Sequence, residues 1–126
     1  MNKAQAIHAF WNGFGLTAYD ENSIPTGKDA PKLPYITYSV STDSIDEPVT
    51  LYANIWDRST SWAFVEQKAQ EIAEAIVKMN PPALQIDNGR LYIAKGNPFA
   101  QRMSDPSDDM VRRVYINISA EFLTAY

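Results

Sequence analysis

The sequence predicts an α+β fold, in which helices pack on one face of a mostly antiparallel β-sheet. Apolar residues recur every three or four positions over residues 61–79, the spacing of a helix with one buried side. Apolar and polar residues alternate along residues 34–41 and again after Met110, the spacing of strands. Strand-like segments precede and follow this one long central helix, which favours α+β over an alternating α/β arrangement.

The length and composition predict one domain, residues 1–126, with an ordinary apolar fraction of 45%. The chain has no cysteine, which excludes disulfides and thiolate metal sites and fits a reducing cytoplasm. Its 15 acidic residues outnumber 11 scattered basic ones, which argues against sequence-specific nucleic-acid binding. We find neither a signal peptide nor an apolar run long enough for a membrane span, so we expect a soluble intracellular protein.

The chain is expected to begin with a short helix, because Ala4, Ile7 and Phe14 recur at helical spacing before Gly15 stops the pattern. A short strand follows at residues 16–19. Residues 20–33 contain prolines, a glycine and several charges, and are expected to form an exposed, mobile loop.

Residues 34–41 and 49–57 are predicted to form an antiparallel hairpin, with its turn at DSIDEP. Along the second strand, alternation places Leu51, Ala53 and Ile55 on one face. Tyr52, Asn54 and Trp56 then lie on the other.

Ser59, Thr60 or Ser61 can each cap the following helix, which Pro81 and Pro82 end. The pair Asn88–Gly89 predicts a second hairpin, and residues 97–109 are expected to form a second mobile polar loop. The last strand is expected to bury alternate residues: Val114, Ile116, Ile118, Ala120 and Phe122.

No group of residues predicts a catalytic, cofactor or metal site. His8 is the only histidine and is interpreted as a packed or partly exposed side chain rather than a general base. The acidic cluster Asp105, Asp108 and Asp109 lacks the glycine and terminal glutamate of a calcium loop, so a solvated loop is favoured. The carboxylates Asp43, Asp46 and Glu47 are assigned to a solvent-screened turn.

Material for contact surfaces is present instead. Arg112 and Arg113 begin the last strand, so their side chains are expected to point to opposite faces, as part of either an ion-pairing edge or an interface. Tyr35, Tyr52 and Tyr115 are expected to form an aromatic stripe on the open face of the sheet. Tyrosine and arginine are enriched at protein–protein interfaces.

The order of segments resembles the tail terminator (tail completion) proteins of long-tailed bacteriophages, also described as minor capsid or head–tail neck proteins. The resemblance covers most of the chain: an N-terminal helix, LPYITYSVS after a polar loop, LYANIWD before EQKAQEIAEAIVKM, then RLYIAKGNPF and MVRRVYINISAEF.

The resemblance implies a non-enzymatic virion protein of the tail or neck that is assembled in the host cytoplasm. It implies a ring, of six copies, that caps the head-proximal end of the tail tube, stops its polymerisation and meets the head–tail connector. DNA would pass through such a ring without being read. We expect interface residues at Arg102, Arg112, Arg113, Tyr115 and Trp56, and no cofactor.

Two alternatives stay open at this stage. One is a small ligand-binding or enzymatic domain with a pocket between helix and sheet, near Trp56 and Trp62. The other is a dimeric interaction module of a cellular complex. The sequence leaves open whether Trp56 packs inside its own chain or against a neighbouring subunit.

Overall fold

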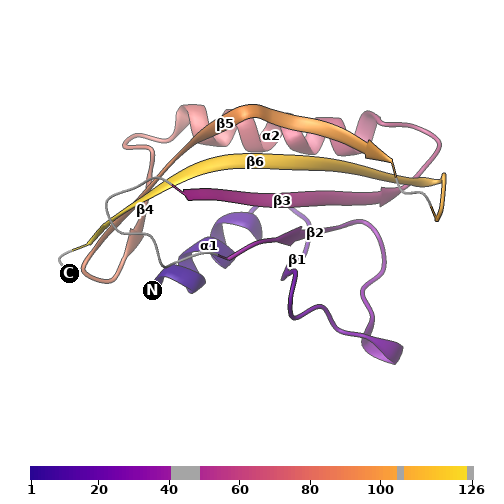
Figure 1. Ribbon diagram of the computed structural model, residues 1–126, viewed down its shortest axis with the longest axis horizontal. Coiled ribbons are helices and arrows are strands. Elements are labelled where there is room, and N and C mark those ends of the chain that lie inside the picture. Colours follow the sequence, from indigo (N-terminus) through magenta and orange to yellow (C-terminus); the bar gives the residue numbers. More distant parts are fainter. Residues whose placement is uncertain (41–48, 105–106, 125–126) are drawn as a thin grey trace.

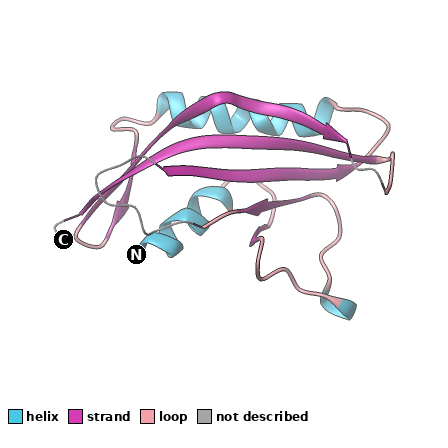
Figure 2. Cartoon of the chain, in the orientation of Figure 1, coloured by secondary structure: helices cyan, strands magenta, loops and turns pink. Residues whose placement is uncertain are grey.

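The computed structural model describes residues 1–40, 49–104 and 107–124. Within these residues it contains the helices α1 (Lys3–Trp11) and α2 (Ala63–Lys78) and a short 3₁₀ turn, η1 (Gly27–Asp29). The strands are β1 (Ala18–Asp20), β2 (Tyr35–Tyr38), β3 (Val49–Arg58), β4 (Ala83–Ile86), β5 (Gly89–Ser104) and β6 (Val111–Thr124). Figure 1 shows their arrangement, and Figure 2 distinguishes helices from strands.

The strands form one curved sheet of six strands in the order β1-β2-β3-β6-β5-β4. Neighbouring strands are antiparallel except β1 and β2, which are parallel. The last strand, β6, therefore lies between β3 and β5, and it pairs with both along most of its length. The α+β class and the mostly antiparallel sheet are confirmed.

Both helices lie on the same face of the sheet, as the strand register shows. Tyr38 faces α1, since its hydroxyl lies 2.8 Å from Nδ1 of His8, and it pairs with Ala53 of β3. Val114 lies beside α2 and pairs with Ile55. Ala53 and Ile55 are two positions apart on β3 and so share one face. This face carries the core, and neither α1 nor α2, the two α-helices of the described residues, lies on the opposite face.

The core is built by the alternation that the sequence predicts. Leu51, Ala53 and Ile55 are at most 1% exposed, and every second residue of β6 from Val114 to Phe122 is buried with them. From the helices, Trp11 and Ile72 are completely buried against these strands. The expected core residues of β3 and β6 are therefore confirmed.

Helix α2 begins close to its expected start, but without a side-chain cap at its N-cap residue, Trp62. Ser61 Oγ instead accepts the backbone N–H of Ala63 at 3.1 Å. Lys68 on this helix donates to the carbonyl of Phe14 at 2.8 Å and so ties α2 to the segment after α1. Figure 1 shows α2 along the β5 side of the sheet, so a helix at the centre of the fold is not confirmed.

The prediction of a loop at residues 97–109 is wrong for residues 97–104, because β5 continues to Ser104. A β-bulge between Lys95 and Ala100 shifts the register with β6, and pairing resumes from Ala100 onward. This half of the strand is mostly exposed, so it shows no apolar alternation. Its hydrogen-bonded pairing with β6 holds it in place.

The second hairpin has a different turn from the one expected. Ile86 pairs with Gly89, so the two turn residues are Asp87 and Asn88. Asn88, the second of these, has a positive φ of 62°. The turn expected between β2 and β3, with Asp43, Asp46 and Glu47, lies outside the described residues.

Candidate interaction surface

The helix-free face of the sheet presents aromatic and uncharged polar side chains around Arg113. These side chains come from alternate positions of β1, β2, β3, β6 and the distal part of β5, and their order follows from the strand register. They are Tyr19, Tyr35, Thr37, Tyr52, Asn54, Trp56, Gln101, Met103, Arg113, Tyr115 and Asn117. We refer to this set as the open face.

Trp56 and Arg113 lie side by side near one end of the open face. They are directly opposite each other in the β3–β6 ladder, and the guanidinium carbon lies 5.1 Å from the centroid of the Trp56 ring. The indole N–H of Trp56 donates to the Thr37 hydroxyl at 2.9 Å. Trp56 is thus half-buried on the surface of its own sheet, with neither helix covering it.

Arg113 has no anionic partner within the residues that the structure describes. Its contact is the ring of Trp56, and its Nε is buried without a hydrogen-bond acceptor. On the other side, the register places Met103 of β5 opposite Arg113. A guanidinium that is partly desolvated and unpaired is a costly state, which an incoming acceptor would relieve.

A second aromatic group lies beside this pair. The rings of Tyr52 and Tyr115 stack with their centroids 5.6 Å apart. The Tyr52 hydroxyl donates to Glu21 at 2.6 Å, and this hydrogen bond, with burial, raises the pKa of Tyr52 above its ordinary value of 10.0. At the β1 edge, Tyr19 and Tyr35 meet edge to face at 5.8 Å. These contacts hold the rings in place, as a preformed contact surface requires.

Two amide groups lie among these rings. Asn54 is only 7% exposed although it faces away from the helices. Its Oδ1 and that of Asn117 are buried without a hydrogen-bond partner among the described residues. Alternation along the last strand places Asn117 on this outward face, as the structure shows. It lies so close to Gly96 of β5 that a Cβ there would be 2.7 Å from the Asn117 carbonyl oxygen.

Arg102 and Arg112 lie on the other side of the sheet, with Trp62 at the start of α2. Their guanidinium carbons lie 5.0 and 5.3 Å from the Trp62 ring centroid. Arg102 pairs with Glu66, and Arg112 donates to the carbonyl oxygen of Asp109 at 2.8 Å. The predicted interface residues therefore divide into two groups: Trp56, Arg113 and Tyr115 on the open face, and the internally bonded Arg102 and Arg112.

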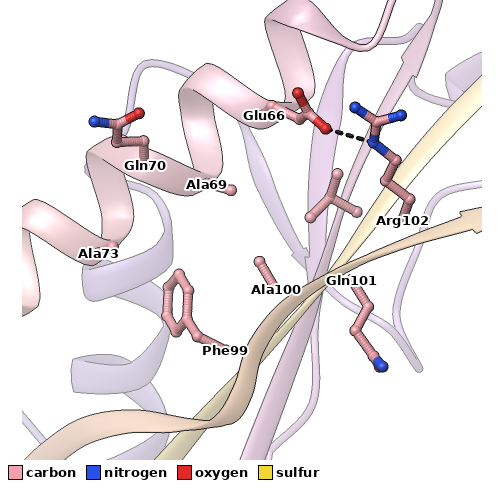
Figure 3. A pocket seen from close by; sticks show the side chains of 9 residues that line it. Glu66, Ala69, Gln70, Ala73, Phe99, Ala100, Gln101 and Arg102 are labelled. Carbon is pink, nitrogen blue, oxygen red and sulfur yellow. Dashed lines mark hydrogen bonds and ion pairs between the residues drawn. The ribbon is translucent and has the colours of Figure 1, made fainter.

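A groove of about 250 Å³ runs between α2 and β5. Figure 3 shows its walls, with Ala69 and Ala73 on the helix and Phe99 and Ala100 on the strand. Its ionisable groups, Glu66 and Arg102, are bonded to each other across one end.

The hypothesis of one pocket near both Trp56 and Trp62 is wrong, because the two rings lie on opposite faces of the sheet. Trp56 shares the open face with Arg113, whereas Trp62 contacts Arg112, the next residue along β6 and therefore on the helix-covered face.

The other candidate groups have structural roles. The His8 ring bonds the hydroxyl of Tyr38, as described above. Asp108 accepts the Met110 N–H at 2.9 Å and pairs with Arg58; these two contacts lower the pKa of its carboxyl below the usual 3.8. Asp105 lies outside the described residues.

Among the described residues, no cluster of metal-ligating side chains is present, and no helix is long and apolar enough to span a membrane.

No protein-family model matches the chain, and no curated protein matches it in sequence. A chain from the solved structure of the virion of a native gene transfer agent (GTA) particle is similar in three dimensions, with a TM-score of 0.60. The similarity covers 95% of this chain and 96% of that chain, at 16% sequence identity. The two chains therefore share a fold over nearly their whole lengths.

Proposed function

We propose that this protein is a structural component of a phage-type virion. The observation that carries the proposal is the fold shared with a chain of the gene transfer agent virion over 95% of this sequence. The resemblance of the segment order to phage tail terminators supports the same class. The open face supplies a preformed contact surface rich in the residue types of interface hot spots.

Within this class, we assign the protein to the tail terminators. Copies of the chain form a ring, of six subunits, on the head-proximal end of the tail tube. The ring stops tube growth and provides the surface for the head–tail connector, and DNA passes through its centre. Assembly takes place in the host cytoplasm, and the finished protein resides in the tail or neck of the virion.

The distribution of polar groups supports a role in assembly rather than in catalysis. The carboxylates of Glu21, Glu66 and Asp108 are each bonded to a side chain of the same protein, so they hold the fold together. The guanidinium of Arg113, by contrast, is held in place by Trp56 while its Nε is buried without an acceptor among the described residues. Such a group is suited to contact with another molecule.

Light scattering of the purified protein, alone and with purified tail tubes, tests the proposal. We expect association that rises with protein concentration and binding at tube ends. A protein that stays monomeric at all concentrations and never binds tube ends would overturn it. A stable dimer without tube binding would instead favour the interaction module of a cellular complex.

A further inference from the structure

The charge around Arg113 is not balanced on the open face. Its neighbours across the ladder, Trp56 and Met103, and its neighbour along β6, Tyr115, are all uncharged. Arg58, at the end of the same face of β3, is neutralised by Asp108. Among the described residues, one positive charge therefore remains at this end of the face, on a guanidinium that the indole ring orients.

A single fixed guanidinium beside aromatic rings fits a carboxylate better than a nucleic acid. Arginine binds a carboxylate through two parallel N–H···O bonds, and one such pair needs only one arginine. A nucleic-acid backbone carries closely spaced phosphates, and binding it requires a row of cations. The open face offers no such row among its described residues, and the chain has a net charge of −4.

A suitable carboxylate, that of Asp29, is exposed on the protein's own surface. The segment between β1 and β2, residues 21–34, leaves the sheet as an arm that projects away from it (Figure 1). The turn η1 forms the part of the arm that carries Asp29, and the backbone is extended at Thr26 before it. Residues 25–30 are all exposed, and Asp29 has no ion pair within the described chain.

We propose that the arm of one copy docks on the open face of a second copy, with the Asp29 carboxylate bound by Arg113 over the Trp56 ring. Two different patches meet in this contact, so it is heterologous and can continue from copy to copy until a ring closes. The inference rests on the proposed function, because it names the surface through which the subunits of the ring join.

Sedimentation velocity over a concentration series tests the contact with four proteins: the wild type, Arg113→Glu, Asp29→Arg and the double variant. Each single variant places like charges opposite each other, so its dissociation constant for self-association should rise roughly tenfold. The double variant restores opposite charges and should return to within about threefold of the wild type. Lys95→Glu is the control, since Lys95 is an exposed residue of β5 without an ion pair among the described residues, and it should associate as the wild type does.

The outcomes separate this inference from the function on which it rests. If the single variants associate like the wild type, or the double variant is no better than they are, the contact is wrong while a self-assembling role stands. If the wild type does not associate at all, both fail. DNA binding that is lost in Arg113→Glu would also overturn the assignment of a carboxylate partner. Circular dichroism of each variant confirms that it is folded.

Discussion

Arg113 lies across the β3–β6 ladder from Trp56, with its guanidinium carbon 5.1 Å from the centroid of the indole ring. This pair joins the end of one strand to the start of the last strand in the chain. It lies on the face that the helices leave uncovered. The contact fixes the direction of a long, flexible side chain and so prepares it for binding.

The Arg113–Trp56 pair should matter little for folding. A partly exposed cation–π contact contributes about 0.5–1 kcal/mol, so Arg113→Gln should lower the free energy of unfolding by no more than that. Trp56→Ala should cost more, because it also removes the buried part of a large ring and its bond to Thr37. Urea denaturation measures both. A loss of several kcal/mol in Arg113→Gln would show that Arg113 is a structural residue.

A substitution in the hydrophobic core should unfold the protein. Ile116 is fully buried between Ala53 of β3 and Ala100 of β5. Ile116→Asp places an unpaired carboxylate there, at a cost of several kcal/mol against a total stability of about 5–15 kcal/mol. The variant should be unfolded or nearly so by circular dichroism. Gln101→Asp, on an exposed position of β5, is the matched control and should retain the native spectrum.

Because β5 and β6 approach closely at Gly96, a larger residue at this position should lower the free energy of unfolding. A Cβ at this position would lie 2.7 Å from the carbonyl oxygen of Asn117, so the two strands must separate in Gly96→Ala. We expect a loss of about 1–3 kcal/mol in unfolding free energy. At Gly13 a Cβ would lie 3.4 Å from its nearest neighbour, so Gly13→Ala should cost much less. Equal effects of the two substitutions in urea denaturation would contradict this account of the bulge.

Asp108 should make the stability depend on pH. The Met110 N–H and Arg58 lower the pKa of its carboxyl, so the ionised form stabilises the fold. This contribution is complete above the unfolded value, near 3.8, and is lost as the pH falls through the lower pKa of the folded state.

The variant Asp108→Asn keeps an acceptor for the Met110 N–H but loses the charge. It should melt below the wild type at about pH 7, and the difference should shrink as the pH falls toward about 2. Thermal unfolding followed by circular dichroism at several pH values measures this difference. A difference that is the same at every pH would show that the charge of Asp108 does not contribute.

The sequence predicts the elements in which side-chain burial decides the structure. Alternation along β3 and β6 and the helical spacing in α2 arise because one face of each element is buried, and these predictions are correct. The distal half of β5 is not predicted, because its side chains are not buried. Residues such as Gln101 and Arg102 are exposed, so pairing with β6 keeps them in a strand while their side chains carry no periodic signal.

The open face can be predicted only in part from the sequence. Trp56, Arg113 and Tyr115 can be named individually from their residue types and strand positions. Their meeting depends on β6 lying between β3 and β5, a long-range pairing that no local pattern encodes. The same topology separates Arg112 from Arg113 and places Arg102 and Arg112 beside Trp62.

The most direct test of a tail-capping role is the length of tail tubes assembled from the tail-tube protein encoded in the same genome, with and without this protein. Negative-stain electron microscopy gives the length distribution and shows the tube ends. The proposed function predicts that added protein arrests growth, shortens the tubes and leaves a ring at one end. Tubes that grow to the same lengths, with bare ends at saturating protein, would contradict it.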